Sequence, residues 1–223
     1  MRSVVAVLRK DLLLELRTRE TVIAMGLFVL SATVMFRFAL DRKSLDGDLA
    51  SGVLLVTVLL GATLGIGRLF VAEREDHGFE AFRLSGADAT AMWAGKLVAI
   101  LLYLLAVQVV AVPAFAVLLR VPVTASAISG LILVLLLLDL GLAAVGTVAS
   151  ALSVQTRTRE LLVPLLALPL SIPLVIACAN LLGPLLVENA TSNLSTTWLA
   201  VALLYDAVFL LVGFAIFEFL LED

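Results

Sequence analysis

The chain has 223 residues, of which 62% are hydrophobic and 15% are charged, and its mean hydropathy is +1.17. Soluble domains are about 45–50% apolar and about 25% charged, so the composition excludes a soluble domain and predicts a membrane protein. The net charge of -3 argues against a nucleic-acid-binding protein, which normally carries a basic face. The single cysteine, Cys178, and the single histidine, His77, exclude a disulfide framework, a cysteine-based zinc site and a two-histidine metalloprotease motif.

Residues 1–20 are predicted to form an amphipathic helix at the membrane surface. At about 100° per residue, from 3.6 residues per turn, cations gather on one side and aliphatic side chains on another. The cations are Arg2, Arg9, Lys10 and Arg17, and the aliphatic side chains are Val5, Leu8, Leu12 and Leu16. This pattern is typical of a helix at the level of the lipid headgroups, although Arg19 falls near the apolar side. The alternative is a polar segment that only leads into the first span.

Hydropathy predicts six membrane-spanning helices, each with the roughly 20 apolar residues that a bilayer requires. The expected spans are residues 21–40, 50–72, 97–119, 126–153, 161–187 and 197–221. The first hydrophobic run continues to Leu40, which is too long for a cleaved signal peptide, so we expect it to be retained. The expected fold class is all-α, with one transmembrane domain over residues 1–223 and no large soluble domain.

The distribution of lysine and arginine predicts the orientation. Eleven of these residues lie on the side of the N-terminus and four on the other, which together account for all 15. Because basic residues accumulate on the cytoplasmic side of membrane proteins, we expect both termini to be cytoplasmic.

The connection over residues 73–96 holds the densest cluster of charges between two spans. An acidic run is followed by a glycine and by aromatic side chains next to charged ones. The residues of interest are Glu73, Arg74, Glu75, Asp76, Gly78, Phe79, Glu80 and Phe82. A short helix with exposed aromatic residues is a candidate docking surface for a soluble partner. The alternative is a solvated loop whose aromatic rings dip into the headgroups.

Two aspartates fall inside predicted spans, where ionisable groups usually face the bundle interior or a water-filled cavity. Asp139 is either a pathway or dimer-interface residue, or a carboxyl group satisfied internally by Gln108, Thr147 or the backbone. The same two interpretations apply to Asp206 in the last span. A further pattern, Gly61 to Gly65, is a GxxxG motif that permits close helix approach.

Three prolines, at positions 164, 169 and 173, predict a kinked fifth span. The kink is either a hinge that moves during transport or a fixed bend that shapes packing. Because freed backbone groups at membrane depth must be satisfied by protein or water, we expect this helix to be packed against its neighbours. Pro169 and Pro173, like the two aspartates, are therefore candidates for a pathway or a packing role.

The sequence resembles the CcmB-type permeases of cytochrome c maturation, which belong with the ABC-2-like exporter membrane subunits. The resemblance covers nearly the whole chain and rests on four stretches: Arg68-Leu69-Phe70, the acidic run before Gly78-Phe79-Glu80, Lys96, and Leu168-Pro169-Leu170-Ser171-Ile172-Pro173-Leu174. It implies a dimeric permease subunit in the bacterial inner membrane that works with a separate ATPase, CcmA, and with the haem-handling proteins CcmC and CcmD. It also implies that the loop residues given above contact the ATPase.

The sequence contains no GxxxxGK[ST] phosphate loop, so we expect that this chain does not bind ATP by that route. ATP is expected to act only through the partner subunit. Haem is expected as a transported ligand held by weak apolar contact, because the usual axial ligands are His, Cys, Met and Tyr and those of this chain have ordinary surface or packing positions. No catalytic residue, metal site or tightly bound cofactor is predicted. The alternatives are an ABC-2 permease for a drug or lipid, and a scaffold that moves nothing.

Overall fold

The computed structural model describes residues 2–68, 89–153, 159–190 and 193–220, and in these residues every regular element is helical. The long helices are α1 (Arg2–Thr18), α2 (Glu20–Ala39), α3 (Gly47–Arg68), α6 (Ala89–Leu118), α7 (Ile128–Ser153), α8 (Arg159–Leu182) and α9 (Thr196–Leu220). Two short 3-10 turns, η1 (Ala125–Ala127) and η2 (Gly183–Leu185), adjoin α7 and α8.

The six expected spans are confirmed: α2, α3, α6, α7, α8 and α9 are each long and apolar enough to cross a membrane. One boundary differs clearly from the prediction. Helix α6 begins at Ala89, well before the expected residue 97, so residues 89–96 are helical and do not belong to the preceding loop. Lys96 was taken to mark the polar edge of the span, but its charge is paired inside the protein and marks no boundary.

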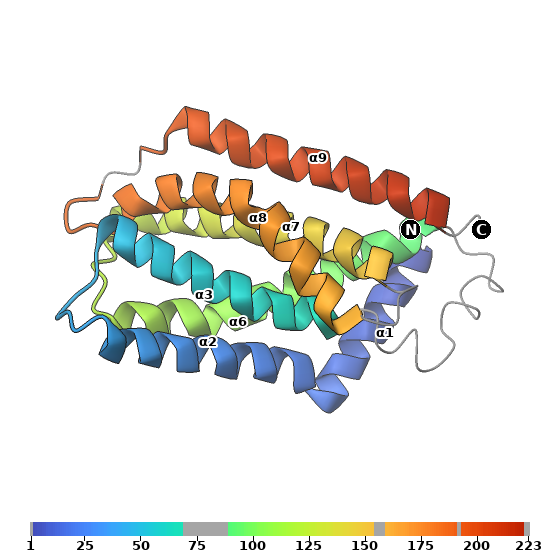
Figure 1. Cartoon of the computed structure of the whole chain (residues 1–223), viewed down its shortest axis with the longest axis horizontal. Helices are drawn as coiled ribbons and strands as arrows, with labels where there is room; N and C mark the ends of the chain where they lie inside the picture. Colours follow the sequence, from blue (N-terminus) through green and yellow to red (C-terminus); the bar gives the residue numbers. More distant parts are fainter. Residues whose placement is uncertain (1, 69–88, 154–158, 191–192, 221–223) are drawn as a thin grey trace.

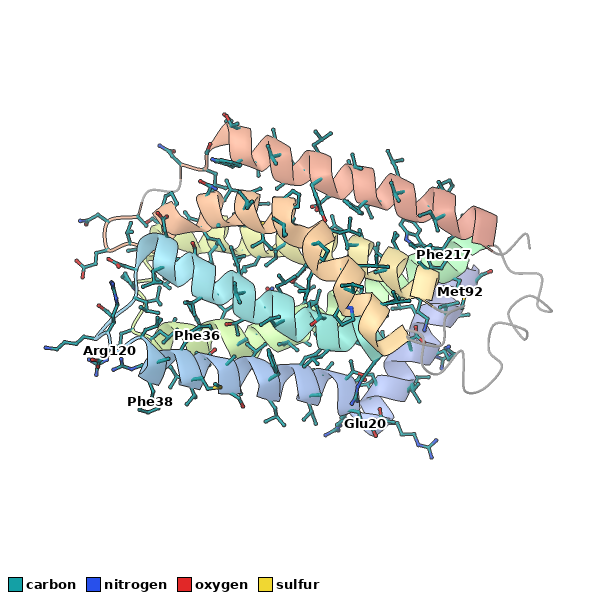
Figure 2. All side chains as sticks on the ribbon, in the orientation of Figure 1. Glu20, Phe36, Phe38, Met92, Arg120 and Phe217 are labelled. Atoms are coloured by element: carbon teal, nitrogen blue, oxygen red, sulfur yellow. The ribbon has the colours of Figure 1, made fainter. Side chains whose placement is uncertain are left out.

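The six spans run side by side along the long axis of the molecule, and α1 lies across one end of the bundle (Figure 1). We call this the α1 end. The end of α3 at Arg68 and the beginning of α6 at Ala89 also lie there. The segments that join α2 to α3, α6 to α7 and α8 to α9 lie at the opposite end. Figure 2 shows Glu20, Met92 and Phe217 at the α1 end, and Phe36, Phe38 and Arg120 at the opposite end.

Helix α7 occupies the centre of the bundle and contacts α3, α6, α8 and α9. Small residues on its second half, among them Ala143, Ala144 and Ala149, are fully buried and let the neighbouring helices approach. Two thirds of the α7 span (67%) is buried, against 17% for α2 and 22% for α9. The outer helices therefore leave most of their apolar surface available to lipid or to other subunits.

The GxxxG motif of α3 is used within this chain. A Cβ atom at Gly61 would lie 2.6 Å from Cγ2 of Val29, and one at Gly65 would lie 2.5 Å from Sδ of Met25. Met25 and Val29 are both buried side chains of α2. The two glycines thus accept α2 of the same chain, which explains the motif by internal packing.

Hydrogen bonds between loops hold the opposite end of the bundle together. The backbone N–H of Leu45 donates to the carbonyl of Leu119 at 3.1 Å, and the N–H of Gly47 donates to the carbonyl of Leu186 at 2.8 Å. The Ser126 hydroxyl donates to the carbonyl of Ala190 at 3.2 Å. The connections of three helix pairs therefore form one interlinked cap.

Candidate functional site

The predicted docking residues lie outside the described residues. They are Glu73, Arg74, Glu75, Asp76, Gly78, Phe79, Glu80 and Phe82. The structure does describe the helices on either side of them: α3 ends at Arg68 and α6 begins at Ala89, both at the α1 end. A force applied to that segment would therefore act first on α3 and α6 and on their contacts at this end.

A buried ion pair joins α1 to α6 at this end. Nζ of Lys96 lies 2.9 Å from Oδ2 of Asp11, and the two side chains are only 2% and 7% exposed. Lys10, which is half exposed, also lies within 3.3 Å of Oδ1 of Asp11. Two charges taken out of water are stabilised only if they stay paired in good geometry, so this contact fixes the position of α1 on α6.

Two further contacts hold α1 and α6 close together at this interface. The Tyr103 hydroxyl donates to the backbone carbonyl of Asp11 at 3.2 Å. Gly95 leaves room for α1, because a Cβ atom there would lie 2.7 Å from Cγ1 of Val7. The face of α6 that receives α1 thus combines a glycine, a lysine and a tyrosine at helical spacing.

The corner between α1 and α2 is built by Glu15. Its carboxylate accepts hydrogen bonds from the backbone N–H groups of Val22, at 2.8 Å, and Thr21, at 3.3 Å. These groups belong to the first turn of α2, where N–H groups lack partners within the helix and attract anions. Arg19 forms the corner itself with a left-handed backbone conformation (φ 55°).

The structure adds detail to the predicted pattern of α1. Helix α1 ends at Thr18, so Arg19 is outside it and its misfit to the pattern disappears. Of the four aliphatic residues, Leu8 and Leu12 pack against the core, while Val5 and Leu16 are 61% and 67% exposed. The residues that α1 buries most deeply are the acidic Asp11 and Glu15, which the sequence analysis had not singled out. A charged residue paired inside the protein looks like a surface residue when hydropathy alone is considered, which is why the pattern did not single out these two acidic residues.

Inside the membrane region, one carboxyl oxygen of Asp139 is hydrogen-bonded to another span, and the other has no hydrogen-bond partner in the described part of the chain. Nε2 of Gln108 on α6 donates to Oδ1 of Asp139 on α7 at 2.7 Å, and Asp139 is fully buried. Thr147 was an alternative partner, but its hydroxyl donates to the carbonyl of Ala144. Gln108 is thus one of the internal partners that the sequence offered for Asp139, and a role of Asp139 in a pathway or dimer interface stays a prediction.

Asp206 on α9 is equally buried, at 2% exposure. Within the described part of the chain, neither of its carboxyl oxygens has a hydrogen-bond partner. Its side chain lies directly over Gly141 of α7, in the space that a Cβ atom of that residue would fill. Asp206 therefore faces the bundle interior, as expected for an ionisable residue in a span.

Helix α8 is bent in its middle, as Figure 1 shows, while remaining one helix from Arg159 to Leu182. The predicted kink at Pro169 and Pro173 is thus confirmed. The Tyr205 hydroxyl of α9 donates to the carbonyl of Leu170 at 2.7 Å, between these two prolines. The bend is therefore held from outside by the neighbouring span, as the need to satisfy backbone groups predicts.

Among the described residues, no group of three or more His, Cys, Asp or Glu side chains could hold a metal ion. Cys178 is fully buried in α8. Met25 fills the groove over Gly65, and the two tyrosines, Tyr103 and Tyr205, donate to backbone carbonyls. These side chains therefore have packing roles.

Comparison with known proteins identifies the family. The family model described as CcmB protein matches residues 2–220, which is nearly the whole chain. The chain belongs to the CcmB family. Within it, heme exporter protein B of Rhodobacter capsulatus is 32% identical over 177 residues, covering 79% of this chain and 80% of that protein. Heme exporter protein B of Bradyrhizobium diazoefficiens is 30% identical over 177 residues, covering 79% of each.

Membership of the CcmB family and the six apolar helices agree on a multi-pass membrane subunit. The match includes α1, α6 and all the remaining long helices. The interface between α1 and α6 therefore lies within the region that defines the family.

Proposed function

We propose that this CcmB-family protein is the membrane-spanning permease subunit of a haem exporter that serves the maturation of c-type cytochromes. The observation that carries the proposal is the family match over residues 2–220 together with two relatives that are both heme exporter protein B. The helical bundle of six candidate spans is the architecture that such a subunit needs.

The protein works in the bacterial inner membrane with both termini in the cytoplasm. The distribution of basic residues supports this orientation, since Arg9, Lys10, Arg17 and Arg68 all belong to helices at the α1 end. The α1 end is then the cytoplasmic end. In this orientation α1 rests at the level of the headgroups with its exposed Val5 and Leu16 toward lipid.

ATP hydrolysis takes place in a separate CcmA-type subunit and reaches this chain by mechanical contact. The contact residues are those of the segment from Glu73 to Phe82, which connects α3 and α6. A nucleotide-driven subunit can act on a membrane partner by shifting it between two packed arrangements. The closely packed α1 end supports this proposal, because a displacement applied there would be passed on to several helices.

Haem is the cargo in this proposal. We expect it to touch the protein mainly through apolar surface, because Met35 of α2, at 70%, is the one largely exposed side chain among the described Cys, Met and Tyr residues. The outer helices offer such surface: Leu204 and Leu211 of α9 are 66% and 69% exposed, and Phe38 of α2 is 81% exposed. The same surfaces are available for a second copy of the chain and for CcmC- and CcmD-type membrane proteins.

The experiment is co-purification of the protein with its CcmA-type ATPase and the CcmC-type protein, followed by ATPase activity and haem absorbance with and without ATP. We expect a complex whose ATP hydrolysis responds to haem or to the haem-loaded partner. A complex whose ATPase activity responds neither to haem nor to the CcmC-type protein would support a permease for a drug or lipid instead. The absence of any ATPase complex would leave a scaffold.

A double charge reversal tests the contact itself. Glu75→Lys with Glu80→Lys should weaken ATPase binding and cytochrome c maturation while leaving membrane insertion intact, because complementary charges at a contact become repulsive. Lys43→Glu is the matched control, since Lys43 is an exposed residue at the opposite end. Normal ATPase binding and maturation in the double variant would refute the contact.

A further inference from the structure

Lys96 has an unusual place for a lysine in a membrane protein. It lies early in α6, within a segment apolar enough to span a membrane, and is 2% exposed. Ionisable residues in such segments are costly, and they normally pair inside the protein and serve a function. Its ion-pair partner, Asp11, belongs to α1, which is not one of the candidate spans.

The pair is one link in a connected series of contacts at the α1 end. Lys96 connects α6 to α1 through Asp11. Glu15, one helical turn beyond Asp11, connects α1 to the first turn of α2. Glu20 of α2 also lies 3.6 Å from Arg68 at the end of α3, but this pair is at the surface and contributes little to the series.

We propose that the Asp11–Lys96 ion pair makes α1 and the beginning of α6 a single moving unit, so that a displacement of α6 driven by the ATPase is delivered through α1 to α2. Asp11 and Lys96 are positioning residues in this mechanism and touch neither haem nor nucleotide. The inference rests on the proposed function, because it assumes that an ATPase acts on the segment between α3 and α6.

The physical reason is the difference between apolar and ionic contacts. Apolar side chains can slide over one another with little change in energy while they stay in contact. A buried ion pair cannot, because separating its members leaves two unpaired charges without water. Gly95 strengthens the restraint by seating Val7 next to the pair. An α6 that shifts or tilts must therefore carry α1 with it.

The first test measures coupling in the complete complex as cytochrome c matured per ATP hydrolysed. The principal variant is the double neutral substitution Asp11→Asn with Lys96→Met, which removes both charges of the pair together, so that neither is left buried without the other. We expect the coupling ratio to fall by about tenfold, within the usual range of coupling between sites. The conservative variant Asp11→Glu should retain most of the ratio, and Arg9→Gln, an exposed cation on the same helix, should leave it unchanged.

The second test measures the motion directly. Spin labels at Arg9→Cys on α1 and Thr90→Cys on α6, in a Cys178→Ala background, report the distance between the two helices in the complex. We expect the same narrow distance distribution without nucleotide and with a trapped ATP analogue. In the Asp11→Asn and Lys96→Met background the distribution should broaden or shift between the two states.

These outcomes separate the inference from the proposed function. If the wild-type complex lacks an ATPase, the proposed function fails. If the ATPase binds and the double neutral variant is folded with an undiminished coupling ratio, the ion-pair inference alone is refuted. A wild-type α1–α6 distance that changes between nucleotide states would refute it as well.

Discussion

The hydroxyl of Tyr205 on α9 donates a 2.7 Å hydrogen bond to the backbone carbonyl of Leu170 on α8, three residues before Pro173. A proline removes the N–H that would bond the carbonyl four residues earlier and disturbs that turn. The carbonyl of Leu170 is the next one along the chain, so the tyrosine supplies a donor at the place where the helix is disturbed. The bend of α8 is thus stabilised by a neighbouring span.

Removing this hydrogen bond should loosen α8 without disturbing its packing. Tyr205→Phe keeps the aromatic ring, whose centroid lies 4.6 Å from that of Phe209, and removes only the hydroxyl. We expect the free energy of unfolding to fall by about 0.5–1.5 kcal/mol, the usual net value of one hydrogen bond. Thermal unfolding in lipid nanodiscs measures it. The cost should shrink in a Pro173→Ala background, where the N–H of residue 173 again bonds the carbonyl of Pro169 and the turn at Leu170 needs less support from α9; equal costs in the two backgrounds would contradict the explanation.

The contact between Asp139 and Gln108 predicts different outcomes for two substitutions. Asp139→Asn retains a side-chain oxygen that can accept from Nε2 of Gln108, so we expect little loss of stability. Asp139→Leu leaves the buried amide of Gln108 without its acceptor, which costs about 1–3 kcal/mol. Unfolding midpoints and the yield of inserted protein measure the difference. If Asp139→Asn impaired cytochrome c maturation at normal stability, the carboxyl group would have a role in the pathway as well.

The number and approximate limits of the spans could be predicted because a bilayer demands long apolar helices and nothing else in this chain is so apolar. The side of each helix that faces protein could not be predicted from the sequence. Lipid is as apolar as leucine, so Leu138, which is fully buried, and Leu136, which is 41% exposed, look alike in the sequence. Polar residues carry the missing information, and Asp139 and Asp206 were correctly expected to face inward.

The ion pair of Asp11 and Lys96 shows where this reasoning fails. Lys96 was predicted to end the polar connection before the third span, and Asp11 was not singled out among the charged residues of the first helix. Their burial depends on α1 folding back against α6, a contact between distant parts of the chain that no local pattern reveals. The early start of α6 at Ala89 has the same origin, because an internally paired lysine does not end a span.

Helix α2 packs so closely against Gly61 that even a methyl group is predicted to be too large at this position. Gly61→Ala places Cβ 2.6 Å from Cγ2 of Val29, a buried β-branched side chain with few alternative rotamers. We expect a loss of about 1–3 kcal/mol, the usual cost of overpacking, and partial rescue by Val29→Ala. Gly67→Ala in the same helix is the control, because nothing lies within 4 Å of its added Cβ. Equal stabilities of the two alanine variants, measured by thermal unfolding, would show that α2 is not seated as described.

The last prediction concerns the Glu15 carboxylate, which caps the first turn of α2. Its effect can be measured at individual backbone amides. Glu15→Ala removes the acceptor for two backbone N–H groups, those of Thr21 and Val22, and should cost about 0.5–2 kcal/mol, as the loss of other helix caps does. Glu15→Gln still offers an oxygen but loses the charge that favours a helix N-terminus, so about 0.3–1 kcal/mol is expected.

Hydrogen exchange at the amides of Thr21 and Val22 distinguishes this loss from a general destabilisation. Both amides should exchange faster in Glu15→Ala, while amides in the middle of α2 keep their protection. Glu20→Ala is the matched control: Glu20 is an exposed acidic residue at the same corner, its 3.6 Å pair with Arg68 is at the surface, and such pairs contribute about 0–1 kcal/mol. Because Glu15 also ties α1 to α2, the alanine variant should lower the coupling of ATP hydrolysis to maturation, and Glu20→Ala should not. Unchanged exchange at both amides in Glu15→Ala would mean that α2 holds its first turn without the cap, and that α1 does not act on α2 through this carboxylate.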